Sequence, residues 1–125
     1  MAEINVLAIG IEPAFADFTA FPELTPELIR DYINRQIEQL RAFGYDPVSC
    51  LVDPGDTAEE MVAQALTSRR FDCILIGAGL RQPPDRLILF EKVINLCRRL
   101  APDASICFNT TPADTVEAVQ RWIRP

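Results

Sequence analysis

Four short apolar segments recur along the chain, and a segment with helical spacing follows each of them. The apolar segments are Ile4–Ile11, Val48–Val52, Ile74–Ile76 and Ala104–Phe108. They are too short to span a membrane, and the third shows no alternation of apolar and polar positions. Each is therefore predicted to form a β-strand, with Ile74–Ile76 buried on both faces at the centre of a sheet.

The intervening segments predict helices, and capping residues mark the first two. Thr25 and Pro26 begin the first helix, and Gly44 ends it in a left-handed conformation. Gln36 interrupts the apolar face of this helix, which is typical of a core amide with satisfied hydrogen bonds. The segment 57–60, Thr-Ala-Glu-Glu, is a capping box for a short second helix.

The two remaining helices differ in their apolar faces. In the third, over Leu87–Leu100, the apolar positions cover about half of the circumference, whereas a surface helix needs little more than about 100°. Ile88 lies on the opposite side, so this helix is either deeply buried or in contact with another subunit. The last helix begins at Pro112 with Thr111 as its cap, and Trp122 is expected to face the sheet.

The regular alternation of strands and helices predicts the fold class. It indicates a parallel sheet with helices on both faces, because parallel strands need crossover connections. Right-handed crossovers favour strand order 2-1-3-4. We therefore expect a three-layer, four-stranded α/β fold of the flavodoxin-like or Rossmann-like type, with residues 1–125 forming a single domain.

One connection is longer than the roughly 2–6 residues usual between a strand and a helix. It runs from Glu12 to Leu24 and contains three phenylalanines, which is typical of a lid, a binding loop or a partner contact. Alternatively, the rings pack over the end of the sheet. A homodimer is therefore expected to form either through the Phe15–Phe21 loop or through the third helix, at Ile88 and Leu89.

Composition narrows the function classes. Apolar residues make up 49% of the chain and charged residues 24%, as in globular proteins. A net charge of −6 and a single lysine, Lys92, argue against a nucleic-acid partner, since phosphate contacts need a basic surface. The N-terminus shows no basic leader and no segment has the length of a membrane helix. We therefore expect a cytoplasmic protein with no membrane partner.

The chain contains no histidine, which removes histidine-based nucleophile pairs, general bases and metal sites. Its four cysteines form no C-x-x-C motif, and three of them fall in predicted strands. We expect small core residues in a reducing compartment, with no metal site, disulfide framework or cofactor. The cysteines are Cys50, Cys73, Cys97 and Cys107.

The carboxyl ends of the strands meet at one edge of the predicted sheet, and ligands of such sheets bind where the winding reverses. Glycines there let a ligand approach backbone N–H groups, and Arg81 offers a planar cation for phosphate or carboxylate. Thr110 and Thr111 precede a helix N-terminus, which favours anions. We therefore expect a small anionic ligand, with no catalytic residue assigned. The candidate ligand-binding residues are Gly10, Glu12, Asp53, Gly77, Gly79, Arg81, Asn109 and Thr110.

These residues also have structural interpretations. Gly77 and Gly79 would shape the turn after the third strand, and Arg81 would pair with Asp85 or Asp53. As ligand contacts, Glu12 and Asp53 are the candidate proton-transfer groups; otherwise they are solvated loop acids. Both interpretations stay open at the level of the sequence.

Known signatures are incomplete at this edge. Gly10 lacks the glycine partners of the Rossmann G-x-G-x-x-G motif, and the P-loop lysine pattern and a hydroxyl-rich FMN phosphate loop are missing. The arrangement resembles response-regulator receiver domains, but Gly77 stands where a receiver carries its phospho-acceptor aspartate. Receiver chemistry is therefore excluded.

Three stretches that together span much of the second half of the chain are Asp72–Arg81, Leu89–Asn95 and Ala101–Pro112. Through them the chain resembles a small family of uncharacterised bacterial Rossmann-like proteins. The resemblance covers most of the length and implies the same fold, but it carries no activity. Two hypotheses follow: binding of a small anionic ligand at the carboxyl edge, enzymatic or not, or a non-catalytic homodimeric interaction module.

Overall fold

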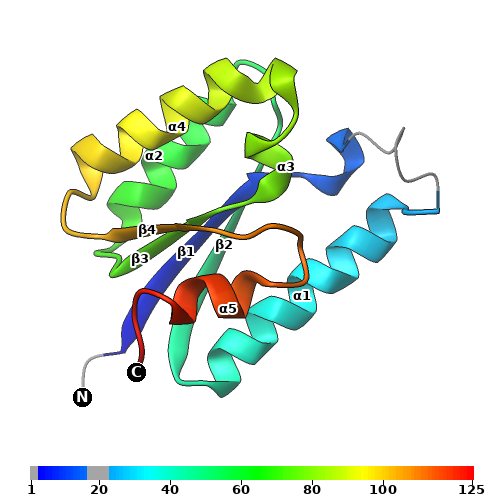
Figure 1. Cartoon of the computed structure of the whole chain (residues 1–125). Coiled ribbons are helices and arrows are strands. Elements are labelled where there is room, and N and C mark those ends of the chain that lie inside the picture. Colours follow the sequence, from blue (N-terminus) through cyan, green and yellow to red (C-terminus); the bar gives the residue numbers. More distant parts are fainter. Residues whose placement is uncertain (1–2, 17–22) are drawn as a thin grey trace.

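A four-stranded parallel sheet forms the centre of the structure, a computed structural model that describes residues 3–16 and 23–125. The strand order is β2-β1-β3-β4, as the sequence predicts. Figure 1 shows the sheet twisting between two layers of helices. The strands are β1 (Ile4–Ile11), β2 (Tyr45–Val52), β3 (Cys73–Ile76) and β4 (Ser105–Phe108).

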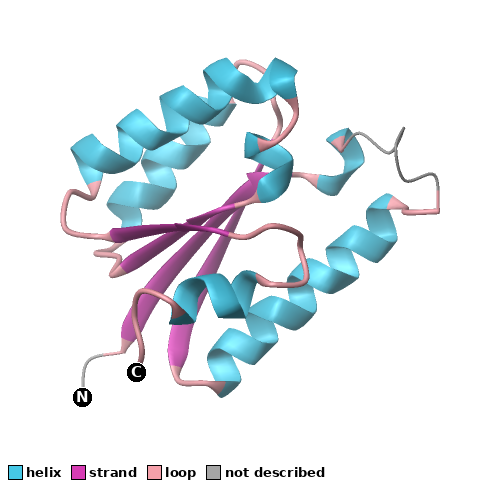
Figure 2. Cartoon of the chain, viewed as in Figure 1, coloured by secondary structure: helices cyan, strands magenta, loops and turns pink. Residues whose placement is uncertain are grey.

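The helices cover both faces of the sheet, which confirms the three-layer α/β architecture (Figure 2). One layer contains α2 and α4, which pack on each other, and the other contains α1 and α5. The helices are α1 (Pro26–Ala42), α2 (Ala58–Ser68), α3 (Ala78–Arg81), α4 (Leu87–Leu100) and α5 (Thr115–Gln120), with 3₁₀ turns η1 (Pro13–Phe15) and η2 (Pro84–Arg86).

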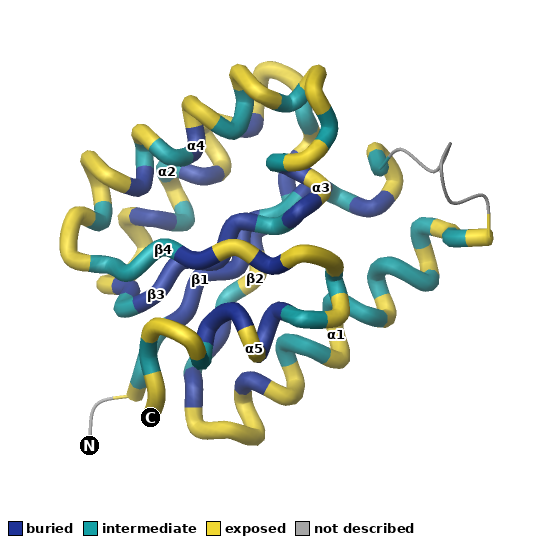
Figure 3. The backbone as a smooth tube through the Cα atoms, in the orientation of Figure 1, coloured by how far each residue is buried: buried dark blue, intermediate teal, exposed yellow. Residues whose placement is uncertain are grey.

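Each sheet face has its own apolar core, because successive side chains of a strand point to opposite faces. Leu7 and Ile74 belong to the core under α2 and α4, whereas Val6 and Leu75 belong to the core under α1 and α5. Every residue of β3 is buried, which confirms its predicted central position (Figure 3).

Three local predictions around α1 are confirmed. The Oγ1 atom of Thr25 accepts a hydrogen bond from the backbone N–H of Leu28 at 3.1 Å, and so caps the helix. Gly44 follows the helix with a φ of 100°. Gln36 is a satisfied amide, since its Oε1 atom accepts from the backbone N–H of Val116 in α5 at 2.9 Å.

One element start and one predicted helix cap differ from prediction. Strand β2 begins at Tyr45 rather than Val48 and includes Pro47. A proline is tolerated there because β2 is an edge strand that pairs only with β1. Helix α2 begins after Thr57 as predicted, but the Thr57 side chain makes no capping hydrogen bond because its backbone is already helical, with φ −88° and ψ −9°.

The chain after β3 and β4 also differs from prediction. A single helical turn, α3, directly follows β3 and was not predicted. Helix α5 begins at Thr115 rather than Pro112, because residues 110–114 form a hydrogen-bonded turn. Trp122 lies beyond the end of this helix and is 63% exposed, so the prediction that it faces the sheet is wrong.

Helix α4 lies on the surface of the molecule rather than deep inside it. Val93 and Cys97 are its fully buried residues. Leu89 is half-buried against the core, while Ile88 is 61% exposed. Of the predicted Phe15–Phe21 loop, Phe15 is exposed, and residues 17–22 lie outside the described part of the chain.

Strand β4 forms the second edge of the sheet. The backbone N–H of Ser105 donates to the carbonyl of Asp72, so the backbone of Ser105 faces β3. Successive residues of a strand face alternate sides, and Phe108 therefore directs its carbonyl away from β3. This carbonyl accepts a hydrogen bond from Nη2 of Arg121 at 2.8 Å. Within the described residues, no helix combines the length and apolarity needed to cross a bilayer.

Candidate functional site

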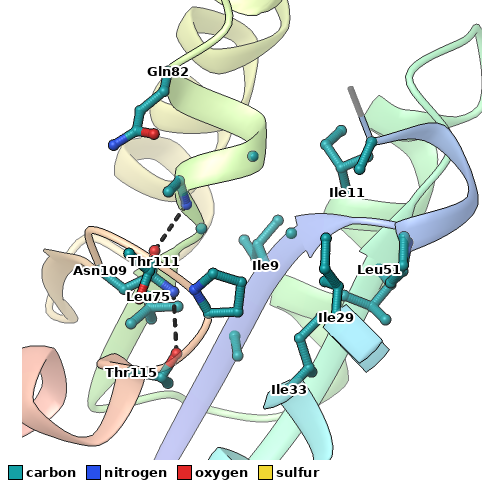
Figure 4. Close-up of a pocket in the computed structure, with 18 of the residues that line it drawn as sticks. Ile9, Ile11, Ile29, Ile33, Leu51, Leu75, Gln82, Asn109, Thr111 and Thr115 are labelled. Carbon is teal, nitrogen blue, oxygen red and sulfur yellow. Dashed lines mark hydrogen bonds between the residues drawn. The ribbon is translucent and has the colours of Figure 1, made fainter. Parts of the chain in front are cut away.

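A cavity of about 640 Å³ lies between α1 and the sheet, at the carboxyl ends of the strands. Strands β1, β2 and β3 form one side, α1 the other, and the segments after β3 and β4 complete it. Figure 4 shows these walls in close-up. The volume falls within the range of pockets that bind small molecules.

The cavity follows from a decrease in side-chain size along the sheet face that α1 covers. On β1 this face runs from Val6 to Ala8 and Gly10, and on β3 it runs from Leu75 to Gly77. Large side chains fill the layer at the amino end of the strands. Small residues at the carboxyl end leave the space open, because no neighbouring side chain is long enough to close it.

The wall opposite the central strands is apolar. Ile29, Ile33 and Ile37 form one stripe of α1, because residues four apart lie on the same side of a helix. Leu51 of β2 continues this wall, and Figure 4 shows it beside Ile29. The three isoleucines are only half-buried, as expected for side chains that face a cavity.

The facing wall is polar and is organised by Asn109, which is only 5% exposed. Its Oδ1 atom accepts from the backbone N–H of Ala78 at 2.8 Å, and its Nδ2 atom donates to Oγ1 of Thr115 at 3.1 Å (Figure 4). The side chain thereby joins the start of α3 to the start of α5. Losing it would leave a buried backbone donor unsatisfied, so Asn109 fixes the shape of this wall.

Asp114 holds the turn between β4 and α5. It accepts hydrogen bonds from the backbone N–H of Thr110 at 2.9 Å, from the Thr110 hydroxyl at 2.6 Å, and from the backbone N–H of Thr111 at 3.0 Å. Burial by itself raises the pKa of Asp114, but these hydrogen bonds together outweigh it and hold the pKa below its usual value. The turn therefore depends on an ionised carboxylate.

Five of the eight predicted site residues come together in the lining of the cavity, from β1, from the segment after β3 and from the segment after β4. Gly79 faces open space, since a Cβ atom added there would meet nothing within 4 Å. The five residues are Gly10, Gly77, Gly79, Asn109 and Thr110.

Arg81 lies outside this lining. Its Nη2 atom donates to the carbonyl of Asn109, and its guanidinium lies 5.2 Å from the ring centroid of Phe108, within reach of a cation–π interaction. Among the described contacts it pairs with neither Asp85 nor Asp53, so that structural alternative is wrong.

The two candidate acids also lie outside the lining. Glu12 forms an ion pair with Arg30 of α1. The Oδ1 atom of Asp53 accepts from the backbone N–H of Gly55 at 2.8 Å and so closes the turn after β2. Both carboxylates therefore have local structural partners.

Several lining residues were not predicted. Ile29 and Ile33 have the spacing of an ordinary core stripe, so no sequence signal distinguishes them from filled core. Gln82 and Arg86 follow the unpredicted turn α3. With Asp85, Arg86 supplies the charge in the lining formed by the described residues.

Within the described part of the chain, no group of three or more acidic or cysteine side chains is arranged to hold a metal ion. All four cysteines are buried free thiols, and burial raises the pKa of Cys97 to about 11. The sulfur atoms of Cys73 and Cys107 lie 3.6 Å apart. The thiols therefore belong to the cores, as the sequence predicts.

No protein-family model matches the sequence, and no curated protein matches it. The resemblance to bacterial Rossmann-like proteins therefore stays an interpretation of the sequence, and the fold rests on the structure alone.

Proposed function

We propose that the protein binds a small molecule with a mainly apolar body in the cavity between α1 and the sheet. The observation that supports this most is the pairing of an apolar wall on α1 and β2 with a polar wall around Asn109. Small-molecule sites are typically apolar clefts with a few placed polar groups. The position also matches the carboxyl edge at which parallel sheets bind ligands.

The polar wall has hydrogen-bonding capacity left for a ligand. The Oγ1 atom of Thr111 accepts from the backbone N–H of Ala113 at 3.0 Å, and that of Thr115 accepts from Asn109. A hydroxyl group that accepts one bond still has a hydrogen to donate. Acceptor groups on a ligand would therefore bind to these threonines, which orients the apolar body toward the isoleucine stripe.

The experiment that tests this proposal is a titration of the protein with decanol, followed by backbone NMR. We expect saturable shifts at Gly10, Gly77 and Thr111, and none at Val62 on the opposite sheet face. Gly10→Val should weaken decanol binding by about tenfold or more. The valine side chain would fill space that the alkyl chain needs, and each methylene group of decanol that is no longer buried costs about 0.8 kcal/mol.

The same variant should keep its fold. The added Cβ atom would lie 3.5 Å from Cδ2 of Leu51, an ordinary contact, and valine favours the strand conformation over glycine. Ile88→Ala, at an exposed position of α4, is the matched control and should bind decanol normally. Saturable binding that survives in Gly10→Val would contradict the proposal.

A second candidate function, a homodimeric interaction module, is favoured by the start of α4. Leu87 and Ile88 are 55% and 61% exposed, side by side. Contiguous patches of exposed apolar side chains are typical of interaction surfaces. The two functions are compatible, since neither Leu87 nor Ile88 lines the cavity.

We also propose a cytoplasmic location. Four buried free thiols without a disulfide suit a reducing compartment. Measuring the location of the tagged full-length chain in fractionated cells tests this directly.

A further inference from the structure

We propose that the ligand of this cavity carries a carboxylate on its apolar body, and that Arg86 binds that carboxylate. The inference rests on the proposed function, because it names the chemical class of the molecule in the same cavity. It assigns the predicted anion contact to Arg86 of η2 instead of Arg81.

Arg86 is built into the site rather than extended into solvent. It lines the cavity, and its Nη2 atom donates to the carbonyl of Phe15 in η1 at 3.1 Å. This hydrogen bond joins two segments far apart in the sequence and holds the guanidinium in place. The Nε atom of Arg86 is buried, and no acceptor for it exists among the described residues.

A buried donor without an acceptor is costly, more so on a charged group. The guanidinium has five N–H groups in a planar fork, and one bond to Phe15 leaves the others to be satisfied. A carboxylate accepts two parallel bonds from such a fork, in the strongest class of protein hydrogen bonds. An anionic ligand group would therefore supply what Arg86 lacks.

The other charges of the site favour an anion with a single charge. Arg81 also has a buried Nε atom without an acceptor among the described residues, but it lies outside the cavity lining and donates to the carbonyl of Asn109. Asp85 also lines the cavity but is exposed, so water can solvate it. One half-buried cation balances one carboxylate, whereas a phosphate dianion would keep an unpaired charge in a mainly apolar site.

The test compares three probes with the same alkyl chain: decanoate, decanol and decylamine. Binding to the full chain is measured by calorimetry and NMR at neutral pH. We expect decanoate to bind more tightly than decanol, and decylamine to bind most weakly.

Arg86→Gln should weaken decanoate binding by about tenfold or more and leave decanol binding unchanged, as the loss of a charge-assisted hydrogen bond predicts. Glutamine carries no charge and is shorter than arginine, so unchanged decanol binding is the check that the cavity of this variant is intact. Asp85→Asn is the matched control: it changes the charge by one unit in the opposite direction at the neighbouring position and should preserve or strengthen decanoate binding.

The outcomes separate the two proposals. If none of the probes binds, the proposed function fails, and this inference fails with it. If all three bind equally, or if Arg86→Gln weakens decanoate and decanol alike, the cavity binds apolar molecules but the carboxylate assignment is overturned. If decylamine binds most tightly, the carboxylate assignment is overturned, and Asp85 is the charged contact of the ligand instead.

Discussion

Arg81 and Arg86 lie close together in the chain but contact different parts of the structure. From the sequence, Arg81 was the natural anion contact because it follows the central strand. The structure inserts the helical turn α3, which carries Arg81 to the ring of Phe108 and brings Arg86 to the cavity. Neither position was predictable, since each depends on residues of other elements, Phe108 and Phe15, that no local pattern connects to them.

Asp114 leads to a prediction about pH. Its pKa in the folded protein lies below its usual value, so its contribution to stability is fully present above the unfolded-state pKa of about 3.9. That contribution is lost as the pH falls through the lower, folded-state pKa. The difference in free energy of unfolding between the wild type and Asp114→Asn should therefore narrow from neutral pH to about pH 2, measured by urea denaturation.

Thr110 provides the control for this prediction. Its hydroxyl and backbone N–H both donate to Asp114, and Thr110→Val loses only the hydroxyl bond. The difference in free energy of unfolding between the wild type and Thr110→Val should therefore narrow less with falling pH than the difference for Asp114→Asn. A difference that stays constant across the pH range would show that the ionised carboxylate does not hold the turn.

At the scale of elements, the same capping pattern has two outcomes. Thr25 is extended, with φ −125° and ψ 160°, and its hydroxyl reaches the backbone N–H of Leu28. Thr57 has the fuller sequence motif but a helical backbone, so its hydroxyl does not reach. The motif specifies a helix start correctly. The capping hydrogen bond depends in addition on the backbone conformation of the cap residue, which the preceding turn sets.

A pair of substitutions tests this difference. Thr25→Ala should lower the free energy of unfolding by about 1 kcal/mol, because it removes a working cap. Thr57→Ala should cost no more than about 0.5 kcal/mol, as for an exposed residue without a specific contact. Urea denaturation of both variants measures the two losses, and equal losses would argue against the observed geometry.

The start of α5 shows a further limit of local reasoning. Thr111 and Pro112 form a good helix start in the sequence, but hydrogen bonds from Thr110 and Thr111 to Asp114 favour a turn instead. The helix begins later, and its backbone N–H at Val116 is satisfied by Gln36 of α1. Such a distant partner leaves no signal near residue 116.

At the scale of the molecule, the sheet order was predictable and the cavity was not. The pattern of apolar residues predicts that strands and helices alternate along the chain. Right-handed crossovers between such strands then lead to a parallel sheet with this strand order. The cavity depends on how the small residues Ala8, Gly10 and Gly77 face the stripe on α1. That volume is a property of two packed layers, so only the folded chain reveals it.

The quaternary state is the matching prediction at this scale. If the start of α4 is an interface, the wild type should sediment as a dimer at about ten micromolar or above. Ile88→Asp should sediment as a folded monomer, since Ile88 is 61% exposed in the isolated chain. Phe43→Asp, at another exposed apolar position beyond the end of α1, should leave the dimer intact. A wild type that is monomeric at this concentration would rule the module out.

The hydrogen bond between Arg121 and the outward carbonyl of Phe108 bears on how copies of the chain meet. An open edge strand can template the addition of a strand from another molecule, which leads to aggregation. Arg121 already occupies an acceptor that an incoming strand would need, and it places a positive charge at that edge. Self-association by strand addition at the β4 edge is therefore disfavoured, which leaves the β2 edge and the helix faces as the surfaces through which an assembly would form.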